Sequence, residues 1–71
     1  MMMKKPTDTE LQGMTVNERL FAMGLLDQWD GAAKARDRDR MIQILGQCAL
    51  SQEQCAQTTD AVLMNPAIYG F

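Results

Sequence analysis

Residues 16–33 constrain the fold most strongly, because their apolar side chains recur at the spacing of an α-helix. At about 100° per residue, four of these side chains fall close together on one side of the helix. They are Phe21, Leu25, Trp29 and Ala32. This stripe contains the only tryptophan of the chain, and we predict that it faces the hydrophobic core.

A capping box marks the start of this helix. The Thr15 hydroxyl can accept a hydrogen bond from the Glu18 amide, while the Glu18 side chain reaches back to the Thr15 amide. Gly24 lies further along the same segment. Because a glycine inside a helix costs only about 1 kcal/mol relative to alanine, we expect a continuous or slightly kinked helix. The alternative is a division at Gly24 into two helices that point in different directions.

A second group of apolar residues falls outside the stripe. Val16, Leu20 and Met23 lie roughly opposite it on a continuous helix. Exposed together, they would form a patch of the kind that marks interaction surfaces. We therefore predict that these three residues form an interface with a protein partner or with a second copy in a homodimer. The alternative is that the N-terminal extension or the C-terminal tail of the same chain covers them.

Two further helices are predicted from caps and apolar periodicity. One covers residues 38–47, with Asp37 as its N-cap. The other follows a capping box that begins at Ser51. It should end at Met64, because Pro66 disfavours a helical conformation for the residue before it.

These elements predict an all-α fold. Residues 14–71 should form a single domain, a small bundle of three main helices plus a short C-terminal turn, with the first helix continuous or divided at Gly24. The apolar tail with Ile68 and Phe71 is expected to pack back on the helices. Residues 1–13 show no sustained apolar period and are predicted to be a disordered tail, with Met14 as an alternative start.

The composition argues against several kinds of chemistry. The chain has no histidine, the commonest general base and metal ligand. Cys48 and Cys55 have no second cysteine pair to complete a zinc site, so we expect two free, buried thiols. Asp27 and Asp30 are expected on the solvated face opposite Trp29. We predict a non-enzymatic protein without catalytic residues, metal or cofactor.

A basic cluster provides the alternative function. Its members are Lys34, Arg36, Arg38 and Arg40. Asp37 and Asp39 are interleaved, so four positive and two negative side chains leave a charge of only +2. The chain as a whole carries a net charge of −2, which weighs against nucleic acid as a partner. A nucleic-acid-binding module that uses this cluster is therefore the second hypothesis, and a solvated helix junction is the simpler interpretation.

The expected location is the cytoplasm. No apolar segment of a signal peptide follows the early lysines. No stretch approaches the roughly 20 apolar residues that a membrane span needs, so we expect no membrane partner.

Much of the chain resembles a group of short bacterial helical proteins with no known activity. The similarity is carried by NERLFAMGLLDQWDGAAKARDRDRMIQIL, by LSQEQCAQTTDAVLMNP and by YGF. It covers residues 16–71, and its motifs are caps, core positions and a helix junction. Gln28 and Trp29 stand where a charged residue and phenylalanine are common in that group. The resemblance implies a compact helical domain in a bacterial cytoplasm and brings no ligand or catalytic residue. From the sequence we thus predict a small protein–protein interaction or regulatory module that self-associates.

Overall fold

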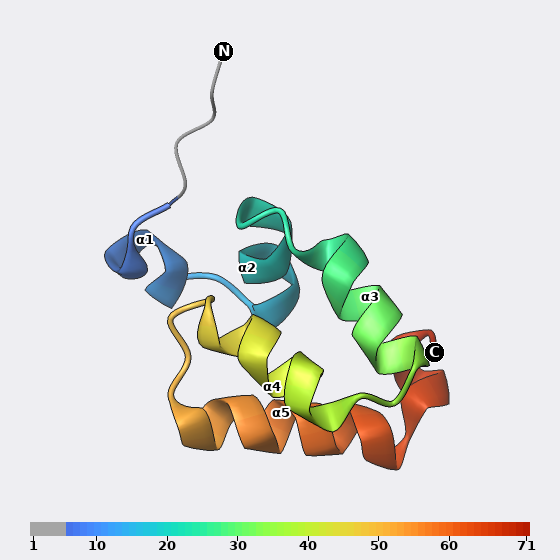
Figure 1. Cartoon of the computed structure of the whole chain (residues 1–71). Helices are drawn as coiled ribbons and strands as arrows, with labels where there is room; N and C mark the ends of the chain where they lie inside the picture. Colours follow the sequence, from blue (N-terminus) through green and yellow to red (C-terminus); the bar gives the residue numbers. More distant parts are fainter. Residues whose placement is uncertain (1–5) are drawn as a thin grey trace.

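The computed structural model describes residues 6–71, which form five α-helices and one closing 3-10 helix (Figure 1). In chain order these are α1 (Asp8–Gln12), α2 (Val16–Ala22), α3 (Leu26–Lys34), α4 (Arg38–Gly46), α5 (Gln52–Met64) and η1 (Pro66–Tyr69). This part of the chain contains no strand. The predicted all-helical class is confirmed.

Helix α4 lies at the centre of the arrangement. It runs antiparallel to α5 as a helical hairpin and also packs against α3 (Figure 1). Helix α2 contacts α3, and η1 turns the chain back against α5. Helix α1 lies at the other end of the molecule, near the loop that joins α4 to α5 (Figure 1).

The hydrophobic core fills the space between these helices. Its members come from the α2–α3 region, from α4 with the loop after it, and from α5. They are Leu20, Leu25, Trp29, Ala32, Ala33, Met41, Ile44, Leu45, Cys48, Cys55 and Val62. Trp29 keeps only 4% of its surface exposed, so the prediction that it belongs to the core is confirmed.

The predicted N-caps are confirmed at three helices. The side chains of Thr15, Asp37 and Ser51 each accept a hydrogen bond from the amide three residues later, at 3.2, 3.2 and 3.1 Å. The Thr15 amide donates in return to Glu18, at 3.0 Å, and this hydrogen bond lowers the pKa of the Glu18 carboxyl. These local signals fix where α2, α4 and α5 begin.

The first predicted helix is divided at Gly24, and the expectation of a continuous helix was wrong. Gly24 has a φ of 71°, in the left-handed region that glycine adopts at low cost. Its amide donates to the Phe21 carbonyl at 3.0 Å, and the Leu25 amide donates to the Leu20 carbonyl at 2.8 Å. These two bonds close α2 in the manner of a Schellman motif, and the burial of Leu20 and Leu25 together favours the break.

The break changes which side chains of α2 face the core. Leu20 is fully buried, whereas Phe21 is 75% exposed. Val16 and Met23 are partly buried against the same core. The prediction that Val16, Leu20 and Met23 point away from the core was therefore wrong, because it assumed one straight helix through Gly24. The core-facing assignment of Phe21 was wrong for the same reason.

A helix also occupies part of the predicted disordered tail. Helix α1 begins with a capping box in which the Thr7 hydroxyl accepts from the Glu10 amide at 3.3 Å. Leu11, on the same helix, is buried. Disorder is therefore wrong for residues 8–12, whose apolar anchor gives this short helix a packing partner. Residues 1–5 lie outside the described residues.

Arg19 connects three parts of the chain from a buried position. Only 7% of its surface is exposed. Its guanidinium donates to the carbonyls of Met14, at 3.1 Å, and Gln12, at 3.5 Å. It also donates to the carbonyls of Cys48 and Ala49, at 3.1 and 3.3 Å. Arg19 therefore links α2 to the end of α1 and to the loop after α4.

The hydrogen bond from Arg19 helps to hold Ala49 in an unfavourable backbone conformation. Its φ of 59° lies in the left-handed region, which costs an alanine roughly 1–2 kcal/mol. Its carbonyl accepts from Arg19 and from Gln12 Nε2, the latter at 3.3 Å. The two donors hold the loop between α4 and α5 in this conformation.

Gly24→Ala tests the break between α2 and α3. Space for a Cβ is available there, but the left-handed backbone is not favourable for alanine, so we expect the free energy of unfolding to fall by about 1–2 kcal/mol. Gly31→Ala is the matched control: it lies inside α3, where an added Cβ meets no neighbour, and should raise stability by about 0.5–1 kcal/mol. Urea unfolding followed by Trp29 fluorescence measures both. Equal stability of the two variants would contradict the assigned break.

Arg19→Lys tests the buried connection. A lysine keeps the charge but cannot reach the same set of carbonyls, so we expect a loss of about 2 kcal/mol in the free energy of unfolding. Arg38→Lys is the control, because Arg38 pairs with Asp60 at an exposed position and should leave stability nearly unchanged. The same urea unfolding experiment compares them, and an equally small effect at both positions would argue against a structural role for Arg19.

Candidate functional site

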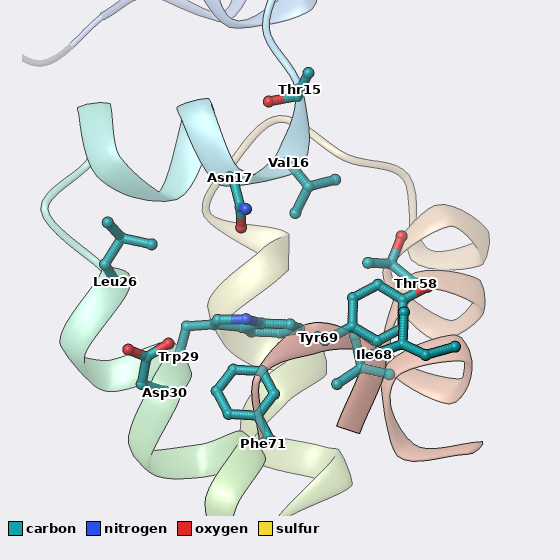
Figure 2. A pocket seen from close by; sticks show the side chains of 11 residues that line it. Thr15, Val16, Asn17, Leu26, Trp29, Asp30, Thr58, Ile68, Tyr69 and Phe71 are labelled. Atoms are coloured by element: carbon teal, nitrogen blue, oxygen red, sulfur yellow. The ribbon is translucent and has the colours of Figure 1, made fainter. Parts of the chain in front are cut away.

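A pocket of about 780 Å³ opens on the surface between α2, α3, α5 and η1 (Figure 2). We call it the Trp29 pocket, because the ring of Trp29 extends from α3 into its middle (Figure 2). It is lined by Thr15, Val16, Asn17, Leu26, Trp29, Asp30, Thr58, Val62, Ile68, Tyr69 and Phe71. Its volume falls in the range of about 300–1,000 Å³ that is typical of ligand sites in proteins.

Helix α3 supplies the floor and one rim. Leu26, Trp29 and Asp30 lie three and four residues apart and so share one face of the helix. Trp29 is buried, and Asp30 is half-buried beside it. Asp30 was expected on the solvated face opposite Trp29, but the structure places both side chains in the pocket lining.

Helix α2 supplies the wall above Trp29. Its cap and first turn contribute Thr15, Val16 and Asn17 (Figure 2). This wall exists because the chain reverses at Gly24, which returns the start of α2 toward α3. Val16 is thus the one member of the predicted interface trio that lines the pocket.

The far wall comes from the C-terminal region. Thr58 and Val62 lie one turn apart on α5, and residues 68–71 approach from η1. The Phe71 amide donates to the Pro66 carbonyl at 2.9 Å. Phe71 is partly buried against the core, as expected for a tail that packs back, whereas Ile68 stays largely exposed at the rim.

Arg36 fixes this wall to α3. Its own backbone is left-handed, with a φ of 57°, and its Nη1 donates to the Ala33 carbonyl at 2.6 Å. Its Nη2 donates to the Phe71 carbonyl at 3.3 Å. One guanidinium therefore bridges the end of α3 and the tail that closes the pocket.

The lining combines apolar and aromatic side chains with polar groups from five residues. Thr15, Asn17, Thr58 and the Tyr69 hydroxyl are neutral, and Asp30 is the one acidic residue. No basic side chain belongs to the lining. The pocket therefore suits an apolar group accompanied by a hydrogen-bonding or positively charged neighbour.

A smaller hollow of about 230 Å³ extends this apolar surface. It is lined by Phe21, Gly24, Leu26 and Asp27. Leu26 belongs to both linings, so the exposed Phe21 ring lies next to the Trp29 pocket. The two features meet at Leu26.

The predicted basic cluster lies on the surface, and its arginines form hydrogen bonds within the chain. All four residues are exposed. Arg38 forms an ion pair with Asp60 of α5, with Nε and Oδ1 2.7 Å apart, and this lowers the pKa of the Asp60 carboxyl. Arg40 donates to Gln28 of α3 at 3.1 Å. Arg38 and Arg40 thus connect helices of the same chain, and Arg36 connects the end of α3 to Phe71.

The remaining candidates offer no assembled reactive centre. Cys48 and Cys55 are free thiols in the core, and burial raises the pKa of both, which disfavours the nucleophilic thiolate. Asp27 is exposed, so it does not share an enclosed site with Asp30. Within residues 6–71, no three His, Cys, Asp or Glu side chains are grouped to hold a metal ion.

Comparison of the chain with protein-family models, with curated proteins and with solved structures found no match. Within residues 6–71, no helix combines the length and apolar character required to cross a membrane.

Proposed function

We propose that this protein is a non-enzymatic protein–protein interaction module and that the Trp29 pocket is its binding surface. The supporting observation is the pocket itself, with a buried tryptophan at its floor and apolar side chains at its rim. Interfaces derive most of their affinity from a few anchors that fill such pockets. An apolar side chain of the partner would contact Trp29 and be surrounded by Val62 and Phe71.

The exposed apolar surface supports an external partner. Ile68 is 73% exposed and Tyr69 is half exposed at the rim, and Phe21 continues the surface on the other side of Leu26. Exposed apolar side chains grouped around a pocket are typical of interaction sites. The interaction predicted from the sequence is therefore retained and moved from the Val16, Leu20 and Met23 trio to the pocket.

The proposal keeps the cytoplasmic location and the absence of a cofactor that the sequence predicts. Nucleic-acid binding has less support, because Arg36, Arg38 and Arg40 all hydrogen-bond to other parts of the chain.

Ile68→Gln tests the binding surface. The probe is a helical peptide of about 16 residues whose leucine and phenylalanine side chains repeat along one face. Trp29, the single tryptophan, reports binding through its emission. Because the apolar rim contact is lost, the dissociation constant of the peptide should rise about tenfold.

Met64→Gln is the matched control, because Met64 is also exposed, at 87%, but does not line the pocket. It should keep the wild-type affinity within about twofold, and both variants should unfold at nearly the wild-type temperature because both positions are exposed. A peptide that binds both variants equally well uses another surface and contradicts the proposal.

A further inference from the structure

The charged side chains that line the Trp29 pocket and the adjoining hollow are both acidic. Asp30 lines the pocket and Asp27 lines the adjoining hollow, three residues apart on α3. Neither carboxylate takes part in an ion pair within residues 6–71, where the pair that forms is Arg38–Asp60. The facing wall, with Thr58, is uncharged. The lining thus has acidic side chains on α3 and uncharged side chains on α5.

We propose that the occupant of the Trp29 pocket is an amphipathic segment of another protein that carries basic side chains along one edge of its apolar face. This inference rests on the function proposed above and specifies the partner. The apolar face of the segment would fill the pocket, and its basic edge would lie against Asp27 and Asp30. Charge complementarity of this kind sets the orientation and the choice of partner.

The half-buried position of Asp30 strengthens this pairing. An ion pair formed beside Trp29 would be shielded from water by the bound segment, and charges interact more strongly when water is excluded. The pairing at Asp27, which is exposed, would be weaker and more sensitive to salt.

A second copy of the chain fits this surface less well. In a symmetric contact centred on the pocket, the same patch of each copy faces the other. The face that each copy offers would then carry Asp27 and Asp30 and no basic lining residue, in a chain whose net charge is already −2. A basic partner therefore complements this face better than a second copy does.

The test compares two peptides with the same apolar face, one with lysine and one with glutamine along one edge. Trp29 emission measures the dissociation constant of each for the wild-type chain, for Asp27→Asn/Asp30→Asn and for Asp39→Asn. We expect the lysine peptide to bind the wild-type chain about tenfold more tightly at low salt. High salt should reduce this ratio.

The variants distinguish an effect of the carboxylates beside the pocket from an effect of the net charge of the chain. The double variant should lower the ratio to within about twofold, because both facing carboxylates are removed. Asp39→Asn, which removes an exposed charge on α4 outside the lining, should leave the ratio near its wild-type value.

Three other outcomes would overturn the basic-edge inference. Equal binding of the two peptides overturns the basic-edge inference and leaves the interaction function standing. Binding of neither peptide overturns both proposals. A dimer detected by light scattering and abolished by Ile68→Gln identifies a second copy as the occupant, which also overturns the inference.

Discussion

The left-handed backbone at Gly24 determines how the first third of the chain meets the rest. Because α2 closes there through two backbone hydrogen bonds, Leu20 enters the core and Phe21 is left at the surface. The same reversal sets the first turn of α2 above Trp29 and so builds one wall of the pocket. In a helix continuous through Gly24, that wall would point elsewhere.

Two arginines complete the arrangement by binding backbone carbonyls where helices end. Arg19 satisfies carbonyls of the loop after α4 and holds α1 in place. Arg36 binds the Phe71 carbonyl and keeps the C-terminal wall of the pocket next to α3. A guanidinium with several carbonyl partners can join segments distant in sequence, because its donors are arranged in a fixed fork.

Much of the fold could be predicted from local signals. The caps at Thr15, Asp37 and Ser51 depend on side chains three residues apart, so the sequence reports them directly. The same capping pattern was present at residues 7–10 and was missed, because the flanking segment is short and polar. The break at Gly24 was harder to predict, because a glycine inside a helix costs only about 1 kcal/mol relative to alanine. One weakened helix and two separate helices were therefore both compatible with the sequence.

The pocket could not be predicted, because its walls come from α2, α3 and the C-terminal region and meet only in the folded chain. The connecting role of Arg19 could not be predicted either, because its partners are backbone carbonyls, which no pattern of side chains in the sequence reveals.

Chemical-shift mapping of the ¹⁵N-labelled chain tests the central claim, that the Trp29 pocket is the binding surface, most directly. On addition of the lysine-edged peptide, the indole N–H of Trp29 and the amides of Val16, Asp30 and Phe71 should shift most strongly, because they line or border the pocket. The amides around Arg38, which does not line the pocket, should change little. Shifts concentrated at Arg38 and its neighbours, with Trp29 unchanged, would contradict the claim.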